Sequence, residues 1–385
     1  MEARKPISLL KPEDNFAETW PEEPDRFTED LVDAFLLWCV KQNSSDVTIQ
    51  TDRPAYNEIH GSLYPGTFRN IDAADMAIFL SKIYGAEAQA RLASGRDLDV
   101  SYEIRPDRYT RIRFRVNITA ILSKGRDSAQ ITMRVLPSEP PTFKDLGIED
   151  EIVKNWAPRQ GLVVITGPTG SGKSTLLAAG NRYLLERPEG CGKMLTYEAP
   201  IEYTYDTVQS PRSLVSQSEI PKHLPDFAHG VRNALRRKPE IILVGEARDR
   251  ETINAAIEAS QTGHAVYTTT HTTGVAATVQ RMLSSYDMSE REERAIALME
   301  TLRLIVTQAL VPRVGGGRCG VREWMIFPDD VREKLMDMDF TQWPNEIQRM
   351  TNQYGQTMQK SAEIVFEEGI IDRRHYLLLS SSTGA

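Results

Sequence analysis

The spacing of hydrophobic positions changes character about a third of the way along the chain. Between residues 44 and 136 apolar and polar side chains alternate, most sharply in TRIRFRVNITAI, residues 110–121. A period of two with one charged face is typical of a half-buried antiparallel strand. From residue 160 onward, short continuous apolar runs are separated by helical segments, which predicts parallel strands covered on both faces. The sequence therefore predicts a small α+β domain followed by an α/β domain.

The first domain is predicted over residues 27–136. Helical spacing of apolar residues predicts helices over 28–42 and 73–84, and alternation predicts a strand over 44–52. The runs DLDVSYEI, TRIRFRVNITAI and AQITMRVL predict three further strands. In the middle run, one face carries Arg111, Arg113, Arg115 and Asn117.

Composition marks the expected domain boundaries. Residues 1–26 are rich in Pro, Glu and Asp and predict a mobile acidic tail. The stretch PSEPP opens a stiff linker, 137–145, and the second domain is expected over 146–385. A helix is predicted at the junction, in FKDLGIEDEIVKNW.

In the second domain four apolar runs predict the strands of a mainly parallel sheet. They are Leu162–Thr166, Lys193–Tyr197, Ile241–Val244 and Ala265–Thr269. After about residue 285 the pattern predicts helices, with Gly315, Gly316 and Gly317 in a loop or hairpin.

The segment GPTGSGKST follows the first of these strands and leads into an apolar helical pattern. It meets the pattern G-x-x-x-x-G-K-[ST], in which backbone amides cradle phosphates, the lysine reaches the outer phosphates and the hydroxyl ligates Mg²⁺. An ordinary glycine turn is the alternative, but strand–loop–helix is the context that the motif requires. The predicted nucleotide-binding residues are Gly167, Pro168, Thr169, Gly170, Ser171, Gly172, Lys173, Ser174 and Thr175.

Acidic residues follow two of the predicted strands. Glu246 ends the run ILVGE, where it would orient the attacking water and contact Mg²⁺ through water, although it could also stabilise a helix N-terminus. Gly245 stands where an aspartate is common, so Ser174, phosphate and waters would hold Mg²⁺. Glu198 and Glu202 lie at the next strand end and would complete this site, unless they are solvated loop acids.

Two histidines bracket the threonine-rich run of TGHAVYTTTHTT. His271 can donate a hydrogen bond to phosphate, whereas His264 fits a structural role nearly as well. Their separation of seven residues across a strand makes them a poor metal pair. The arginine face of the first domain, including Arg113, Arg115 and Arg134, is either solvated or supplies a neighbouring subunit's site with transition-state charge.

Composition narrows the class of protein. The net charge of −8 and the pI near 5.5 argue against a broad nucleic-acid footprint and weigh against the alternative of a DNA-translocating ATPase. No apolar run approaches the roughly 20 residues of a membrane span, and the start lacks a secretory signal. The isolated Cys39, Cys191 and Cys319 predict neither disulfides nor a zinc site and fit a cytoplasmic location.

The motifs together resemble the secretion ATPases of type IV pili and type II/IV secretion systems. The resemblance rests on GPTGSGKST, TYEAPIEY, ILVGEARDRETI and TGHAVYTTTHTT, with RFRVN, MRVLP and GQTMQKSAEIVFEEGII similar to PilT-like motors. Over about residues 27–372 the chain looks most like the DotB/TraJ branch, the cytosolic ATPases of Dot/Icm-type and related conjugative systems.

This resemblance implies a homo-hexameric ring, a PAS-like first domain, and a RecA-like P-loop NTPase domain that binds ATP and Mg²⁺. It implies a Walker A role for Lys173 and Ser174, a Walker B role for Glu246, and nucleotide-reaching positions for Arg115 and Arg134. The acidic box contains Glu198 and Glu202, and the histidine box contains His264 and His271. The implied partners are an inner-membrane secretion apparatus, at whose cytoplasmic face the ring would act, and a second apparatus ATPase.

The sequence departs from the family pattern at three points. Ala199 replaces the aspartate of the usual Glu-Asp-Pro acidic box. The tetracysteine element of extension motors and the retraction signature of pilus motors are both missing from the sequence. The last two departures favour a secretion ATPase. A pilus retraction motor, a DNA-translocating RecA-fold ATPase and a slowly hydrolysing nucleotide-gated adaptor remain as alternatives.

Overall fold

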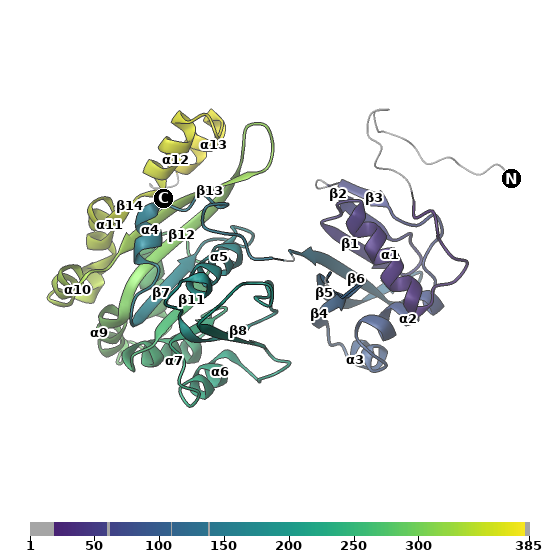
Figure 1. Cartoon of the computed structure of the whole chain (residues 1–385), viewed down its shortest axis with the longest axis horizontal. Helices are drawn as coiled ribbons and strands as arrows, with labels where there is room; N and C mark the ends of the chain where they lie inside the picture. Colours follow the sequence, from purple (N-terminus) through teal and green to yellow (C-terminus); the bar gives the residue numbers. More distant parts are fainter. Residues whose placement is uncertain (1–18, 60–61, 109, 138, 382–385) are drawn as a thin grey trace. The chain divides into compact units, whose positions relative to one another are not determined.

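The structure is a computed structural model that describes residues 19–381, except 60–61, 109 and 138 (Figure 1). The chain divides into two compact units, residues 1–138 and 139–385, which are described separately below. The predicted acidic tail lies for the most part outside the described residues. Within the described part of the chain, no helix combines the length and the apolarity that crossing a bilayer would require.

The first unit is an antiparallel sheet with helices packed on it (Figure 1). The described strands follow the order β3-β2-β1-β6-β5-β4. Their bounds are β1 Asp46–Gln50, β2 Tyr56–Ile59, β3 Ser62–Pro65, β4 Leu98–Ile104, β5 Ile112–Ser123 and β6 Arg126–Leu136, and the helices are α1 Glu29–Lys41, α2 Ala73–Ile83 and α3 Ala88–Ala93. The predicted alternation in β5 is present, because Phe114, Val116 and Ile118 are fully buried while Arg115 is exposed.

The core of this unit begins before Phe27. Trp20 is only 3% exposed, and its ring lies 5.5 Å from that of Phe35 and 6.0 Å from that of Phe27. Aromatic pairs at such distances add to the area that they bury. The folded unit therefore includes residues that acidic composition alone assigns to the tail.

The second unit contains a mainly parallel sheet. The described strands follow the order β14-β13-β12-β7-β11-β10-β8-β9, and pairing is antiparallel only within β12-β13-β14. Their bounds are β7 Gly161–Thr166, β8 Gly192–Glu198, β9 Ser213–Glu219, β10 Ile241–Val244, β11 Ala265–Thr270, β12 Leu302–Pro312, β13 Arg318–Ile326 and β14 Gly355–Gln356. The described helices are α4 Asp150–Asn155, α5 Lys173–Glu186, α6 Phe227–Ala234, α7 Arg250–Gln261, α8 Val275–Ser284, α9 Arg291–Thr301, α10 Asp329–Met336, α11 Trp343–Tyr354, α12 Met358–Glu367 and α13 Arg373–Ser381, with a short 3₁₀ helix, η1 Phe340–Gln342.

The central strand β7 is buried on both faces. Leu162 and Val164 join the core that includes α6 to α9, whereas Val163 and Ile165 join a second core that includes α4 and α5 (Figure 1). This arrangement explains why the strand is continuously apolar in sequence. It also places the end of β7, and the loop that follows, between helices on opposite sides of the sheet.

Two sequence expectations are wrong in the second unit. The region after residue 285 is not only helical, because Leu302–Pro312 forms β12 beside β7 and Arg318–Ile326 returns as β13. The glycine triplet lies in the turn between these strands, and its three φ angles are all positive. The helix expected over 143–156 is reduced to α4, since a turn with Gly147 at φ 56° precedes it.

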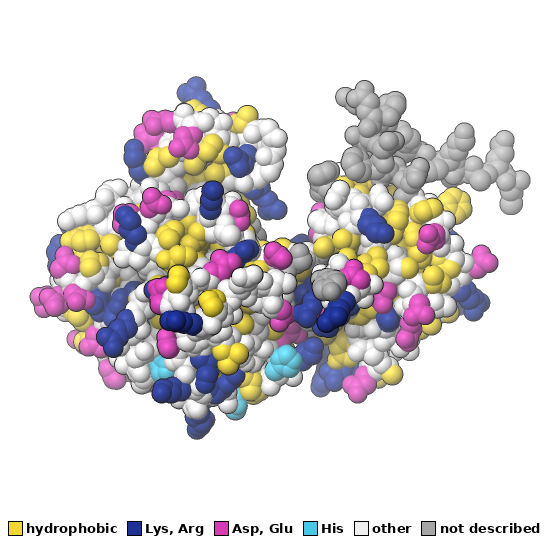
Figure 2. Space-filling model, in the orientation of Figure 1, with side chains coloured by type: hydrophobic (Ala, Val, Ile, Leu, Met, Phe, Trp, Pro, Cys, Tyr) yellow, Lys and Arg dark blue, Asp and Glu magenta, His cyan; other side chains and the backbone are white. Residues whose placement is uncertain are grey.

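The visible face of the second unit carries interspersed basic and acidic side chains (Figure 2). No broad basic field covers this view of the described residues. The pattern on this face agrees with the acidic composition of the chain.

Candidate functional site

The phosphate loop, Gly167–Thr175, joins β7 to α5 as the sequence predicts. Gly167 has φ 142° and Gly172 has φ 81°, which are conformations that favour glycine. A Cβ atom at Gly167 would lie 2.3 Å from the carbonyl oxygen of Gln308, and one at Gly172 would lie 2.9 Å from the Gln308 amide nitrogen. Both glycines are therefore required by backbone conformation and by close packing against β12.

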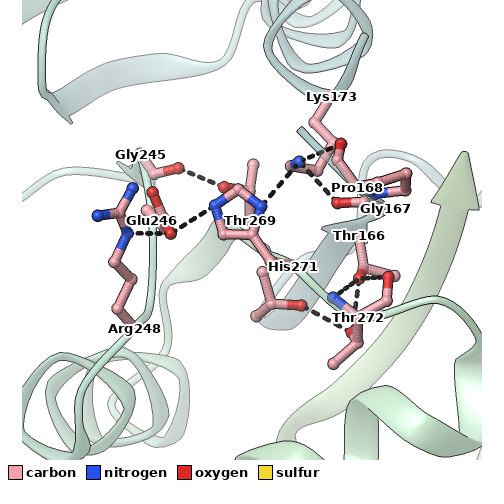
Figure 3. A network of polar contacts seen from close by, with 11 residues as sticks. Thr166, Gly167, Pro168, Lys173, Gly245, Glu246, Arg248, Thr269, His271 and Thr272 are labelled. Carbon is pink, nitrogen blue, oxygen red and sulfur yellow. Dashed lines mark hydrogen bonds and ion pairs between the residues drawn. The ribbon is translucent and has the colours of Figure 1, made fainter. Parts of the chain in front are cut away.

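Lys173 is held inside the loop. Its side chain is largely buried, and Nζ donates to the carbonyl oxygens of Gly167 at 2.7 Å and Pro168 at 3.0 Å (Figure 3). Burial lowers the pKa of the Lys173 ammonium, although the carboxylates of Glu246 and Glu202 act in the opposite direction. The ammonium is thus poised for an anionic ligand, which would replace two neutral acceptors with charged ones.

His271 lies between Lys173 and Glu246 (Figure 3). Its Nδ1 is 3.3 Å from Lys173 Nζ, and its Nε2 is 2.8 Å from Glu246 Oε1. A lysine ammonium has no acceptor, so Nδ1 must accept the bond and Nε2 must carry the proton. This tautomer lets Nε2–H donate to the carboxylate, and the imidazole links the loop at the end of β7 to the acid at the end of β10.

Glu246 follows β10 and is largely enclosed, with its side chain 17% exposed. The same oxygen, Oε1, is paired with the Nε atom of Arg248 (Figure 3). The neighbouring residue Gly245 donates its N–H to Tyr197 on β8, and its carbonyl accepts a 2.6 Å bond from the Thr269 hydroxyl. These backbone contacts fix the strand end that carries the acid.

A set of threonine hydroxyls fixes the segment that carries His271. Thr166 at the end of β7 accepts a 3.0 Å bond from the Thr272 N–H, and its hydroxyl lies 2.6 Å from that of Thr272. The Thr272 hydroxyl lies 2.7 Å from that of Thr278 on α8. The threonine run thus ties the residue after His271 to the start of the phosphate loop.

The acidic box adds a fourth strand end, that of β8. Glu198 Oε1 accepts from the Thr196 hydroxyl at 2.6 Å and from Gln217 Nε2 at 3.1 Å. The Tyr203 hydroxyl lies 3.1 Å from the Thr175 hydroxyl, so this segment also reaches the phosphate loop. Glu202 lies near enough to Lys173 to act on its charge.

The structure does not bring His264 to this site. His264 precedes β11 and His271 follows it, so the two residues lie at opposite ends of one strand. The Nδ1 atom of His264 is 3.0 Å from the Ala259 carbonyl oxygen and 3.2 Å from the Thr262 hydroxyl at the end of α7. Within this chain His264 therefore contacts the end of α7 and not the phosphate loop, and its expected nucleotide contact stays a prediction.

Arg115 and Arg134 belong to the first unit, where they occupy directly opposed positions on β5 and β6. Arg134 Nε donates to Asp46 at 2.9 Å, while its side chain remains 67% exposed. The neighbouring Arg113 is 6% exposed, so it does not belong to an open arginine face. A contact between Arg115 or Arg134 and a neighbouring subunit's nucleotide cannot be seen in a single unit, so that role stays a prediction.

Sequence reasoning missed five residues whose side chains bond to the site residues or to the backbone beside them. They are Arg248, Thr269, Tyr203, Gln217 and Gln308. Only Arg248 carried a local signal, because it lies two positions after Glu246. The others reach the site through strand pairing and loop packing, which join residues far apart in sequence.

The geometry fits a bound triphosphate and Mg²⁺. Gly172 is the N-cap of α5 and has no side chain to bond the first amides of that helix, which suits an anionic ligand. The buried Ser171 hydroxyl also has no hydrogen-bond partner among the described residues. Across the described part of the chain, no three His, Cys, Asp or Glu side chains gather as a metal site. The phosphate-loop motif gives the Ser174 hydroxyl the chemistry of a Mg²⁺ ligand, and this role stays a prediction.

Comparisons with known proteins identify the family of the chain. The family model for type II/IV secretion system proteins matches residues 22–337. The type IV pilus retraction ATPase PilT of Pseudomonas aeruginosa is 31% identical over 340 residues, which cover 88% of this chain and 95% of that protein.

Solved structures extend the likeness to the fold. The X-ray structure of the Legionella pneumophila ATPase DotB has a TM-score of 0.84 and 46% identity, and the match covers 96% of this chain and 100% of that one. The structure of the pilus retraction motor PilT with bound ADP has a TM-score of 0.79 and 28% identity, with 91% of this chain and 96% of that one covered. The chain is therefore an ATPase that belongs to the type II/IV secretion system protein family.

Proposed function

We propose that this ATPase works as a Mg²⁺-dependent homo-hexamer that powers a type IV secretion system. The observation that carries the catalytic part is the bridge from Lys173 through His271 to Glu246, at 3.3 Å and 2.8 Å. It joins a phosphate-binding cation to a strand-end carboxylate, the two groups that phosphoryl hydrolysis requires side by side. The two units would correspond to a PAS-like domain and a RecA-like domain.

Lys173 is the residue that senses occupancy of the loop. Its ammonium is held by the carbonyls of Gly167 and Pro168, and phosphate oxygens are stronger acceptors because they are charged. ATP would therefore draw Lys173 away from these carbonyls and from His271. The imidazole Nδ1 would then lose its donor.

Glu246 orients the attacking water, and His271 reports the state of the outer phosphate. In this structure the carboxylate is engaged by Nε2–H of His271 and by Arg248. Both partners bind Oε1, so release of either one frees a lone pair on that oxygen, which can then accept a proton from water. When Mg²⁺ is bound it would neutralise developing phosphate charge, with Ser174 as a direct ligand and Glu198, Glu202 and Glu246 acting through water.

The nucleoside would occupy a cavity of about 600 Å³ beside the phosphate loop. This cavity contacts the loop at Gly172 and Thr175 and extends over Leu310, Ile364 and Val365. Its volume falls in the range of small-ligand sites, and its aliphatic side chains suit the face of an aromatic base. All of its lining residues belong to the second unit.

The ring arrangement is proposed because the family to which the chain belongs implies a homo-hexamer. Arg115 and Arg134 would act on a neighbouring subunit's nucleotide. The ring would be recruited from the cytoplasm to an inner-membrane apparatus that also contains a second ATPase. The 46% identity to DotB, described as an ATPase of Legionella pneumophila, supports the secretion branch.

A pilus retraction motor is the second candidate function. It is favoured by the 31% identity to PilT over nearly the whole of both chains. In cells that carry this gene, Lys173→Ala would stop export of secreted substrates under the first proposal. Under the second it would leave pili extended and abolish their retraction, so the two readouts separate the candidates.

A mixing experiment tests the shared site. Lys173→Ala and Arg115→Ala are purified separately, and both are expected to have little turnover of ATP. If Arg115 acts between subunits, mixed rings restore activity at about a quarter of their interfaces, because each interface needs an intact residue from both sides. Arg91→Ala, an exposed arginine on α3, is the matched control. Mixtures no more active than their components would contradict the role of Arg115, and the same design applied to Arg134 tests the alternative.

A further inference from the structure

Arg322 is a buried cation that the catalytic site does not use. It lies on β13 with 3% exposure, and its guanidinium binds partners from separate parts of the second unit. Nη2 donates to the Leu146 carbonyl at 3.0 Å, and Nη1 lies 3.2 Å from both the Gly147 carbonyl and Glu149 Oε2. All three partners belong to the turn that precedes α4.

The fourth contact of Arg322 leads to the phosphate loop. Its Nε donates at 2.8 Å to Oε1 of Gln308, which stands directly opposite on β12. The other end of that amide, Nε2, donates at 2.7 Å to the Ser171 carbonyl. Arginine offers only donors and a carbonyl only accepts, so the Gln308 amide has one satisfactory orientation and both ends are fixed.

The far end of this chain of contacts lies close to the covalent link between the units. We call residues 140–149 the lead-in segment, since the chain enters the second unit through it. Beyond the turn held by Arg322, the Pro140 carbonyl accepts a 2.7 Å bond from Arg182 on α5, and Phe143 packs 5.2 Å from the ring of Trp156. The lead-in segment is thus in contact with α5, the helix that follows the phosphate loop.

We propose that Gln308 and Arg322 are positioning residues that couple the state of the phosphate loop to the lead-in segment. The path runs from the Ser171 carbonyl through the Gln308 amide to the Arg322 guanidinium and on to residues 146–149. Ser171, Gln308 and Arg322 are buried, and the planar guanidinium fork holds its acceptors in fixed directions. A displacement of Ser171 by bound phosphate must therefore either move the lead-in segment or break a buried hydrogen bond.

The path also forms part of the wall of the proposed nucleoside cavity, which is lined by Gly172, Gln308, Arg322, Gly147 and Glu149 among others. Occupancy of the cavity and occupancy of the loop would therefore bias the same contacts. The inference rests on the nucleotide site proposed above and assigns to it a route of communication toward the first unit.

Hydrogen exchange measured by mass spectrometry tests the coupling. The full chain is compared without nucleotide and with saturating ADP, and the readout is the change in exchange rate over residues 140–149. We expect roughly a fivefold change or more in the wild type, the lower end of ordinary allosteric coupling. In Gln308→Met, which keeps the side-chain length but removes both hydrogen bonds, the change is expected to disappear while ADP still binds.

Each variant is compared with itself, with and without ADP, so a general increase in hydrogen exchange caused by the substitution is not counted as coupling. Arg322→Lys keeps the Gln308–Ser171 bond and the buried charge but loses the fork, so it decides the outcome if Gln308→Met fails to fold or to bind ADP. The matched control is Glu151→Gln, since Glu151 is an exposed acid that pairs with Lys154 on α4. In both coupling variants kcat should fall at saturating ATP.

Three outcomes overturn the inference. One is a wild-type chain that binds ADP without a change over residues 140–149. The others are an ADP-binding Gln308→Met or Arg322→Lys variant that retains the full wild-type change. A wild-type chain that binds no ADP instead contradicts the proposed nucleotide site itself, so the two failures are distinguishable.

Discussion

Replacing Glu246 by glutamine separates the roles of charge and shape at the strand end. The amide keeps the dimensions of the side chain, and its oxygen can still accept from Nε2–H of His271, now 2.8 Å from Oε1. What is lost is the negative charge, which pairs with Arg248 and can take a proton from water. The bonds of Lys173 to Gly167 and Pro168 do not involve Glu246.

The expected loss is in turnover and not in binding. A positioned proton acceptor is worth about 10²- to 10⁴-fold in rate, which corresponds to about 2.7–5.5 kcal/mol of activation free energy. Affinity for ATP should stay the same or increase, because a negative charge near the phosphates is removed. Glu246→Gln should therefore trap ATP without hydrolysing it.

Phosphate release at saturating ATP and equilibrium binding of a fluorescent ATP analogue measure the two effects. The matched control is Glu251→Gln, an exposed acid in the first turn of α7. Turnover within tenfold of wild type would refute the catalytic role of Glu246. Binding that is weakened more than tenfold would show that the carboxylate acts mainly on the ground state.

Three further results are expected. Lys173→Ala should weaken ATP binding by roughly 10- to 150-fold, because a charged hydrogen bond contributes about 1.5–3 kcal/mol; calorimetry checks this, with Arg159→Ala, an exposed arginine between α4 and β7, as the control. Burial lowers the pKa of Lys173, and phosphate binds its charged form, so ATP affinity should fall as pH rises, beginning below the range of an ordinary lysine; titrations across alkaline pH that show no fall would contradict this. Gly180→Ala should destabilise the second unit by about 1–3 kcal/mol in urea unfolding, because the new Cβ would lie 2.1 Å from the Trp156 indole, and an unchanged midpoint would contradict it.

The local parts of the site were predictable from sequence because they are local in structure. The phosphate loop depends on a strand, a glycine turn and a helix that follow one another directly. Glu246 and His271 each follow an apolar strand, and parallel strands bring their carboxyl ends to one edge of the sheet. Their contact through the imidazole still required the structure, since spacing does not fix side-chain direction.

The features that the sequence did not predict depend on contacts between residues distant in sequence. LRLIVTQALVP contains apolar residues at most positions, so its periodicity does not distinguish a buried strand from a helix. The structure decides in favour of β12 because it pairs with β7 from Leu304–Val163 to Thr307–Thr166. Gln308 and Arg322, polar residues that a pattern assigns to the surface, are buried because each satisfies the other across β12 and β13.

Gly245, which precedes Glu246, is explained by the close packing of β8 against the end of β10. A Cβ at Gly245 would lie 3.0 Å from the Tyr197 carbonyl oxygen and 3.2 Å from Glu198 Cα, both backbone atoms of a paired strand that cannot easily move. The missing side chain therefore lets β8 approach the end of β10, where the Gly245 N–H donates to Tyr197 at 2.7 Å. That approach brings Glu198 beside Gly245, the position at which an aspartate is common. The close approach of β8 thus explains the glycine at position 245, and the last residue of β8, Glu198, places a carboxylate next to that position.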